Sequence, residues 1–170
     1  MAKVIVVDAS KCYACLGCVV ECAYQRSGAG EHVSLTSGVL LSAVCEVIAV
    51  GADPVPLMCN HCADAPCLTV CPTEAIHRQS PEGPVMLMRE LCIGCKACVM
   101  ACPFGMVHMG REGTTAVKCD MCSDRLAVGR QPACVEACIT GALEVRELED
   151  VVSESQARAG AMVLAGGVHK

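Results

Sequence analysis

Cysteine is the residue type that dominates the chemistry open to this chain, with 17 cysteines among 170 residues. All except Cys45 fall into four groups of four, and each group begins with C-x2-C and ends with C-x3-C. Groups one and three have the pattern C-x2-C-x2-C-x3-C, whereas groups two and four have longer middles. In chain order the groups are Cys12, Cys15, Cys18, Cys22; Cys59, Cys62, Cys67, Cys71; Cys92, Cys95, Cys98, Cys102; and Cys119, Cys122, Cys134, Cys138.

This spacing suits a cubic 4Fe-4S cluster, which is held by four thiolates. Three cysteines spaced by two residues form a loop short enough to wrap three corners of the cube. The small residues Ala14, Gly17, Gly94 and Ala97 would let backbone N–H groups point at the cluster sulfides. The fourth cysteine, such as Cys102, follows about one helical turn later and is expected to leave the loop on a helix. In the bacterial run C-x2-C-x2-C-x3-C-P, that cysteine binds the other cluster of a pair.

Zinc and disulfide bonds are the other two uses of so many cysteines. Zinc takes four cysteines from two C-x2-C knuckles, so group four alone is compatible with a zinc site. Groups one and three are not, because a zinc knuckle does not use three thiols spaced by two. The first ten residues do not match a signal peptide, which predicts a cytoplasmic protein with reduced thiols. An odd number of cysteines also leaves no closed disulfide framework.

Five residues near the groups need a separate interpretation. Cys45 lies in an apolar stretch and is expected to be a buried structural residue, not an iron ligand. His61 is expected to hydrogen-bond near a cluster, since four cysteines already complete its group. Lys96, Lys118 and Arg125 stand beside cysteines, where a positive charge would raise a cluster's potential. Ordinary solvated surface charges explain these three residues equally well.

Short elements must position the cysteines. Apolar runs predict strands over residues 3–8, 85–88 and 142–147, and a turn or two of helix is expected after the last cysteine pair of each group. A longer helix is expected only in the tail, from residue 147 to 160. The longest apolar stretch, residues 38–51, contains a glutamate and is too short to span a membrane. With three aromatic residues and no Trp, something other than large rings must fill the interior.

The chain offers little for other function classes. Its net charge is −5 and it has no basic block, so neither nucleic acid nor an anionic lipid surface is an expected partner. No Ser-His-Asp or Cys-His nucleophile pattern, P-loop or Rossmann glycine motif is found. The chain is therefore not expected to be an enzyme in its own right.

Three stretches together resemble a known family. "CNHCADAPCLTVCPTEAI", "CIGCKACVMACPFG" and "KCDMCSDRLAVGRQPACVEACITGAL" are similar to the consecutive motifs of four-cluster ferredoxin-type subunits. Such subunits accompany molybdenum and tungsten oxidoreductases, among them formate dehydrogenase and dimethyl sulfoxide reductase, with relatives beside hydrogenases and carbon monoxide dehydrogenase. The resemblance covers residues 3 to about 146. Ile139 stands where proline is common, and Ala23 follows Cys22, but neither departure removes a ligand.

The resemblance implies an α+β fold of two interleaved bacterial-ferredoxin-like modules packed around four 4Fe-4S clusters. The outer module would comprise residues 3–52 and 112–147, the inner module residues 53–111, and a C-terminal helical tail residues 148–170. The strands at the two ends of the outer module would then pair with each other.

The resemblance also implies that each cluster takes three cysteines from one group and the fourth from another. The outer clusters would be held by Cys12, Cys15, Cys18 with Cys138, and by Cys119, Cys122, Cys134 with Cys22. The inner clusters would be held by Cys59, Cys62, Cys67 with Cys102, and by Cys92, Cys95, Cys98 with Cys71. Four clusters would fill the interior, so a chain without iron should be largely unfolded.

These features predict a non-catalytic electron-transfer subunit. It would relay single electrons through four clusters between a catalytic subunit and a second redox subunit or carrier. The preferred catalytic partner is a molybdenum or tungsten pterin enzyme acting on formate or an aldehyde, with a hydrogenase or carbon monoxide dehydrogenase second. A free-standing polyferredoxin and, more remotely, a zinc-binding interaction module are the alternatives. The tail at residues 148–170 would dock on a partner subunit or on another copy of this chain, or else be a fraying end.

Overall fold

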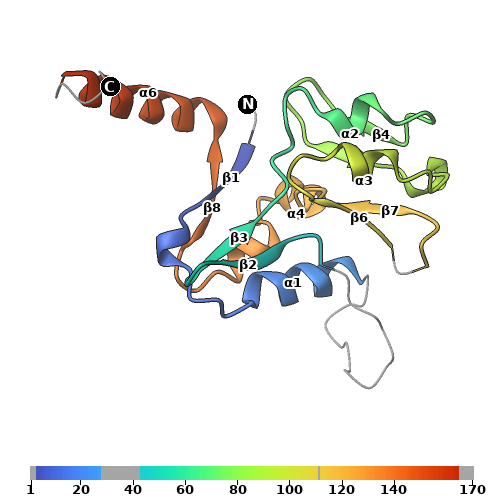
Figure 1. The fold of residues 1–170 in the computed structure, drawn as a ribbon, viewed down its shortest axis with the longest axis horizontal. Helices are drawn as coiled ribbons and strands as arrows, with labels where there is room; N and C mark the ends of the chain where they lie inside the picture. Colours follow the sequence, from blue (N-terminus) through green and yellow to red (C-terminus); the bar gives the residue numbers. More distant parts are fainter. Residues whose placement is uncertain (1–2, 28–42, 111, 165–170) are drawn as a thin grey trace.

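The computed structural model of the chain describes residues 3–27, 43–110 and 112–164. These residues form short helices and short antiparallel strands, which confirms the expected fold class (Figure 1). The strands are β1 Lys3–Val7, β2 Glu46–Val50, β3 Asp53–Leu57, β4 Ile76–Arg78, β5 Val85–Leu87, β6 Val107–Met109, β7 Ala116–Lys118 and β8 Leu143–Glu147. The helices are α1 Gly17–Arg26, α2 Pro66–Thr69, α3 Ala97–Ala101, α4 Ser123–Ala127, α5 Ala133–Glu136 and α6 Leu148–Leu164, with 3₁₀ turns η1 Ala9–Lys11 and η2 Arg89–Leu91.

The first and last strands pair with each other. β1 runs antiparallel to β8, with Lys3 opposite Glu147 and Val7 opposite Leu143. The Asp8 N–H extends the ladder by donating to the Ala142 carbonyl at 2.8 Å. This pairing confirms the expectation, implied by the family resemblance, that the strands at the two ends of the outer module pair, and it joins residues that are far apart in the sequence.

The other described strands form local hairpins, β2–β3, β4–β5 and β6–β7. The β2–β3 hairpin was not among the strands that the sequence predicted, and it contains Pro54 and Pro56. Both prolines lie in β3, opposite Ala49 and Val47 of β2. Proline is tolerated there because a two-stranded hairpin leaves the outer edge of each strand unpaired, so those positions need no ladder N–H.

The C-x2-C-x2-C loops of groups one and three share one local geometry. Each follows a 3₁₀ turn, η1 or η2, and leads into a helix, α1 or α3. Two residues of each loop take positive φ angles: Ala14 (55°), Leu16 (58°), Gly94 (68°) and Lys96 (66°). Leu16 and Lys96 stand immediately before the two helices, in the left-handed region that bulky residues rarely occupy. Such strain persists only where the surrounding structure fixes it.

Buried side chains gather in two cores, both rich in cysteine. The outer core consists of Cys18, Cys22, Val44, Cys45, Met58, Val117, Cys134 and Leu143. The inner core consists of Ala65, Cys67, Ile76, Val85, Cys98, Val107 and Ala116. No aromatic side chain belongs to either core within the described residues. The apolar packing is therefore thin, and the cysteines stand where a larger core would be.

Helix α6 extends beyond β8, away from the rest of the molecule (Figure 1). Its side chains are largely exposed, including Val152 and Leu164. Arg146 of β8 donates to both carboxylate oxygens of Glu154, at 2.7 and 2.5 Å, which ties the helix to the strand before it. The longer helix predicted for the tail is present and runs slightly further than residue 160.

Candidate functional site

Four cysteines from two different groups line one cavity in the inner region. Cys92, Cys95 and Cys98 come from the group-three loop, and Cys71 comes from just after α2. We call this the Cys71 cavity. The set is the one that the family resemblance implied for these residues. Cys95 is exposed, so the cavity lies near the protein surface.

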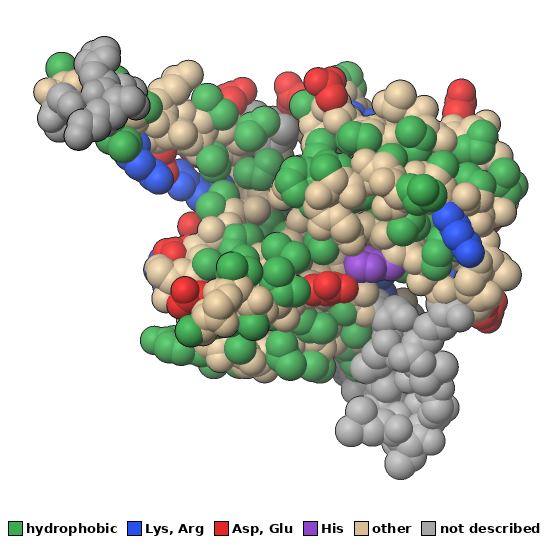
Figure 2. Space-filling view, in the orientation of Figure 1, with side chains coloured by type: hydrophobic (Ala, Val, Ile, Leu, Met, Phe, Trp, Pro, Cys, Tyr) green, Lys and Arg blue, Asp and Glu red, His purple; other side chains and the backbone are tan. Residues whose placement is uncertain are grey.

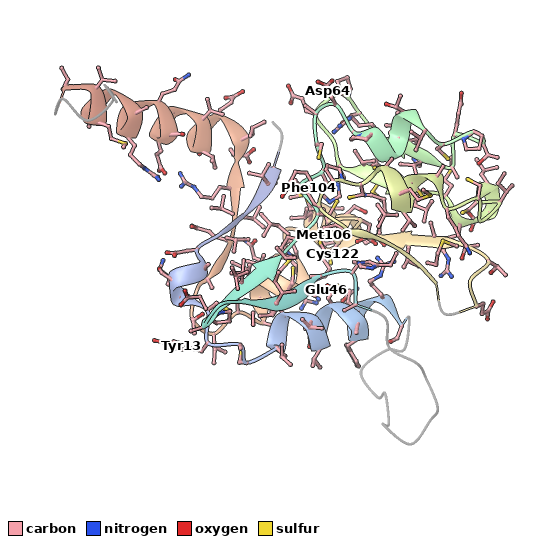
Figure 3. All side chains as sticks on the ribbon, viewed as in Figure 1. Tyr13, Glu46, Asp64, Phe104, Met106 and Cys122 are labelled. Carbon is pink, nitrogen blue, oxygen red and sulfur yellow. The ribbon has the colours of Figure 1, made fainter. Side chains whose placement is uncertain are left out.

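A second cavity is lined by the reciprocal set. Cys59, Cys62 and Cys67 come from group two, and Cys102 comes from the end of α3. We call this the Cys102 cavity. Since Cys98 and Cys102 stand one helical turn apart but line different cavities, the fourth cysteine of group three leaves the loop of its own group. The Met106 side chain, labelled in Figure 3, also lines this cavity near the middle of the molecule.

A third cavity lies in the outer region. It is lined by Cys119, Cys122 and Cys134 of group four and by Cys22 of α1. We call this the Cys22 cavity. Cys59 reaches both this cavity and the Cys102 cavity, so the two are neighbours. Cys122 is likewise labelled near the middle of the molecule in Figure 3.

The remaining predicted set is Cys12, Cys15, Cys18 and Cys138. Helix α1 contacts α5, which ends two residues before Cys138, and both Cys18 and Cys138 pack in the outer core. A Cβ atom on Gly17 would lie 3.3 Å from the Ala137 carbonyl oxygen, so the group-one loop approaches the backbone beside Cys138 closely. Tyr13, next to Cys12, lies at the outer edge of the molecule (Figure 3).

The backbone around the cysteines offers N–H groups to sulfur. The bonds run from Met106 to Cys102 (3.3 Å), from Met121 to Cys119 (3.3 Å) and from Ala116 to Cys92 (3.4 Å). Thiolates that bind a metal accept such bonds, which stabilise the negative charge on sulfur. All-sulfur sets of four, with N–H donors to several of the sulfurs, fit a 4Fe-4S cluster. A bound cluster of this type takes up and releases one electron at a time.

Burial and the neighbouring Cys45 thiol shift the pKa values of the outer thiols in opposite directions. Burial raises the pKa of Cys134 to about 12, and it raises the pKa of Cys119 well above the ordinary range. The neighbouring Cys45 thiol lowers the pKa of Cys18 to about 7 and that of Cys22 to about 6. Since only a thiolate ligates iron, deprotonation of the buried thiols is coupled to metal binding.

Cys45 is buried, as predicted, but it contacts two predicted ligands. Its thiol donates to the Cys18 carbonyl oxygen at 3.5 Å, and it lines the Cys22 cavity. Its contacts with Cys18 and Cys22, together with burial, raise the pKa of Cys45, so the thiol keeps its proton. The sequence contained no signal for this contact, because Cys45 lies outside every group.

The three cations singled out from the sequence lie in different environments. Lys118 is 2 % exposed, which excludes the interpretation as a solvated surface charge. Arg125 forms an ion pair with Glu136 of α5, and its side chain is largely buried. Lys96 is exposed on the group-three loop. A further cation that the sequence did not single out, Arg78 of β4, braces the group-two loop by donating to the carbonyls of Cys62 and Ala63.

His61 lines the Cys102 cavity, next to Cys62. Its Nδ1 accepts a hydrogen bond from the Val85 N–H at 3.0 Å, and its Nε2 is buried and has no partner among the described residues. Burial, together with the positive charges of Lys118 and Arg78, lowers the pKa of His61 to about 3. The ring is therefore neutral near pH 7, with its proton on Nε2.

A family model described as a 4Fe-4S dicluster domain matches residues 50–148 of the chain. The chain belongs to this family. Membership of this family identifies the cofactor, because the protein carries 4Fe-4S clusters. Its four groups of cysteines provide enough ligands for four clusters. The matched range includes group four, so the zinc interpretation of that group is set aside.

Several curated proteins resemble this 4Fe-4S dicluster protein over most of its length. The putative electron transport protein YsaA of Escherichia coli K12 is 38% identical, over 89% of this chain and 94% of its own. The electron transport protein HydN of the same organism is 34% identical, over 95% and 99%. One subunit of the tetrathionate reductase of Salmonella typhimurium is 35% identical, over 86% and 58%. This chain is likewise an electron-transfer protein and not a catalytic subunit.

A solved structure resembles the chain more loosely. A chain of the structure titled "Active site complex BamBC of Benzoyl Coenzyme A reductase as isolated" is 19% identical, with a TM-score of 0.46 over 98% of this chain and 92% of that one. Among the described residues, no helix is long and apolar enough to cross a membrane.

Proposed function

We propose that the chain is the electron-relay subunit of an oxidoreductase complex, with its clusters bound in a single row. Each proposed cluster takes three cysteines from one group and one from another, as the family resemblance implied. The sets are Cys12, Cys15, Cys18, Cys138; Cys22, Cys119, Cys122, Cys134; Cys59, Cys62, Cys67, Cys102; and Cys71, Cys92, Cys95, Cys98. Three of these sets line the three cavities described above.

The main support for the proposal is that short helices connect successive sets of cysteine ligands. Helix α1 carries Cys18 and Cys22, and α3 with its final residue carries Cys98 and Cys102. Two residues four positions apart are separated by about 6 Å along a helix, so neighbouring clusters are held close together. Cys59, at the wall of two cavities, links the outer pair to the inner pair.

The two ends of the proposed row are accessible. Cys15 and Cys95, which belong to the first and last sets, are exposed, whereas Cys22 and Cys67 in the middle sets are buried. Exposed apolar side chains stand beside both ends: Tyr13 at 79 % in the group-one loop and Ile93 at 65 % in the group-three loop. Figure 2 shows hydrophobic side chains gathered over the part of the molecule that carries α1 and β2. Such patches are typical of surfaces that bind other proteins.

We also propose two modules, with boundaries adjusted to the cores. The expected boundaries at residues 52/53 and 111/112 fall within the β2–β3 and β6–β7 hairpins. Met58 and Val117 pack in the outer core, while Ala65 and Ala116 pack in the inner core. The inner module would therefore run from after Met58 to Ala116, and the outer module would comprise the chain on either side, without the tail.

For the catalytic partner we propose a molybdenum or tungsten pterin enzyme acting on formate or an aldehyde. The support is the family resemblance and the presence among the relatives of a probable anaerobic dimethyl sulfoxide reductase chain, YnfG, 43% identical over 56% of this chain. A second redox subunit or carrier would take the electrons at the other end of the row. In that setting the chain works in the cytoplasm.

The test is anaerobic purification of the full, tagged chain from the cells that make it. We expect an equimolar catalytic subunit containing molybdenum or tungsten, and bleaching of the iron-sulfur absorbance when formate or an aldehyde is added. A nickel-containing partner whose clusters are reduced by hydrogen or carbon monoxide would overturn the proposed partner but not the relay. Clusters that no associated enzyme reduces would overturn the relay itself.

A free-standing carrier is the second candidate, and the lengths of the relatives favour it. YsaA and HydN, both named electron transport proteins, are matched over 94% and 99% of their length, whereas the tetrathionate reductase subunit is matched over 58%. The tail distinguishes the two candidates, because we propose that α6 docks on the partner subunit or on a second copy. If deletion of residues 148–170 leaves both co-purification and particle size unchanged, the tail has no docking role.

A further inference from the structure

Lys118, the last residue of β7, is a buried cation without a carboxylate partner in the part of the chain that the structure describes. Its ammonium group donates to two carbonyl oxygens, those of Val85 and of Cys119, the latter at 2.8 Å. Carbonyls satisfy two of its three N–H donors but do not balance its charge. An isolated buried ammonium is strongly unfavourable, so a negative charge beside it would stabilise it.

The cysteine sulfurs of the Cys102 cavity are where that negative charge would be. Lys118 is one of the residues that line this cavity. Burial raises the pKa of Cys67, and the positive charge of Lys118 opposes that rise. A 4Fe-4S cluster with four thiolate ligands has a net negative charge, and each electron that it takes up makes the cavity more negative by one.

His61 adds a second donor at the same cavity. The Val85 N–H occupies Nδ1, which leaves the buried Nε2 as an N–H without an acceptor among the described residues. The Val85 backbone thus contacts both groups, because its N–H bonds His61 and its carbonyl accepts from Lys118. A buried N–H without a partner is rare in proteins, and here a cluster or ligand sulfur would be its acceptor.

The charged groups at the neighbouring cavities act differently. The Cys22 cavity is lined by both members of an ion pair, Asp120 and Arg26 at 3.4 Å, whose opposite charges offset each other. Burial raises the pKa of Cys122, and the negative charge of Asp120 raises it further. The Cys71 cavity has Lys96 at its wall, but that side chain is exposed, and water screens its charge.

We propose that Lys118, with His61, gives the cluster of the Cys102 cavity the highest reduction potential in the chain, so that the first electron entering the row rests there. The inference rests on the ligand sets of the proposed function, but not on the identity of any partner. The step is the transfer of one electron from an external donor to the cluster, with no proton taken up. The ammonium stabilises the added negative charge, and hydrogen bonds to sulfur act in the same direction.

The experiment is a redox titration of the full, iron-loaded chain under anaerobic conditions, followed by electron paramagnetic resonance. In Lys118→Met the equilibrium constant for the first reduction should fall at least tenfold, which is 59 mV for one electron. A buried opposite charge shifts an ionisation equilibrium by about one to three powers of ten, so tenfold is the lower end. Lys118→Arg, which keeps the charge, should stay within about threefold of the wild type.

Lys96→Met is the matched control, because it removes an exposed lysine from another cavity, and it should change the first reduction less than threefold. The component that shifts in Lys118→Met must be the one altered in Cys62→Ser. An unchanged first reduction in fully loaded Lys118→Met, or a shift in a component that Cys62→Ser leaves intact, overturns the proposal. Should Lys118→Met bind less iron, Lys118→Gln is titrated instead, because its amide can donate to the same carbonyls without a charge. The titration needs no partner, so its outcome is separate from that of the co-purification.

Discussion

Gly94 is a position where a single methyl group should destabilise one cluster selectively. It lies between Cys92 and Cys95, at a φ of +68°, and a Cβ atom there would lie 2.3 Å from the Thr114 carbonyl oxygen. The equivalent residue of the group-one loop is Ala14, which adopts a φ of 55°. Alanine is therefore compatible with this loop conformation, and the approach of Thr114 is what requires glycine at residue 94.

The cost of Gly94→Ala can be worked from these two facts. The left-handed conformation costs a residue with a Cβ atom about 1–2 kcal/mol. Ordinary contact begins at 3.4 Å, so the Thr114 carbonyl must also retreat by about 1 Å. Forcing an extra carbon into a packed site costs typically about 1–3 kcal/mol. The total is about 2–5 kcal/mol. The movement would also disturb Ala116, two residues further on, whose N–H donates to Cys92 Sγ at 3.4 Å.

The assay is the rate at which visible iron-sulfur absorbance is lost when the anaerobic, iron-loaded chain is heated or exposed to a chelator. The control is Gly51→Ala in the β2–β3 turn, where φ is +64° and the Cβ would meet nothing within 4 Å. Gly51→Ala therefore carries the conformational cost alone. We expect Gly94→Ala to lose about one quarter of its iron well before the rest, and Gly51→Ala to resemble the wild type. Equal iron loss in the two variants would refute the steric argument.

Three further outcomes follow from the proposed site. Cys102→Ser should alter the cluster of the Cys102 cavity, whereas Cys95→Ser should alter the cluster of the Cys71 cavity. Electron paramagnetic resonance should therefore show a different altered component in each variant. If both variants alter the same component, the crossed ligand sets are wrong. Removal of iron from the full chain should abolish most of its far-ultraviolet circular dichroism, because the two cores are thin, and iron and sulfide should restore it. A retained spectrum would show that apolar packing alone holds the fold. His61→Phe should lower the first reduction potential less than Lys118→Met does, since it removes a hydrogen bond but no charge. If redox titration shows the same first potential in His61→Phe as in the wild type, His61 Nε2 does not donate to the cluster.

Local patterns in the sequence predicted the elements that depend on local chemistry. The short apolar runs at residues 3–8 and 142–147 predicted two strands, and their pairing followed from the family resemblance. The cysteine spacing predicted the loops and the short helices after them. These features depend on residues that are close in sequence, or on a pattern long enough to fix its own period.

The features that the sequence did not reveal depend on tertiary contacts. The sequence did not predict the β2–β3 hairpin, whose second strand contains two prolines that the free outer edge of the hairpin accommodates. Gly17 and Ala97 were among the small residues expected to shape the cysteine loops. The residues before them, Leu16 and Lys96, are the ones that take the left-handed conformation. Propensity disfavours that conformation for both side chains, so only the folded structure could identify them.

Lys118 illustrates why neighbours in sequence are a poor guide to what controls a cluster. It directly precedes the first cysteine of group four, and from that position a raised cluster potential and a solvated surface charge were equally good explanations. Yet β7 places Lys118 at the wall of the Cys102 cavity, beside residues from group two that come more than fifty positions earlier. Groups one and three share the same cysteine spacing, so spacing alone cannot make the four clusters differ. The differences must come from side chains such as Lys118, His61 and Asp120, whose position follows from the fold and not from the motif.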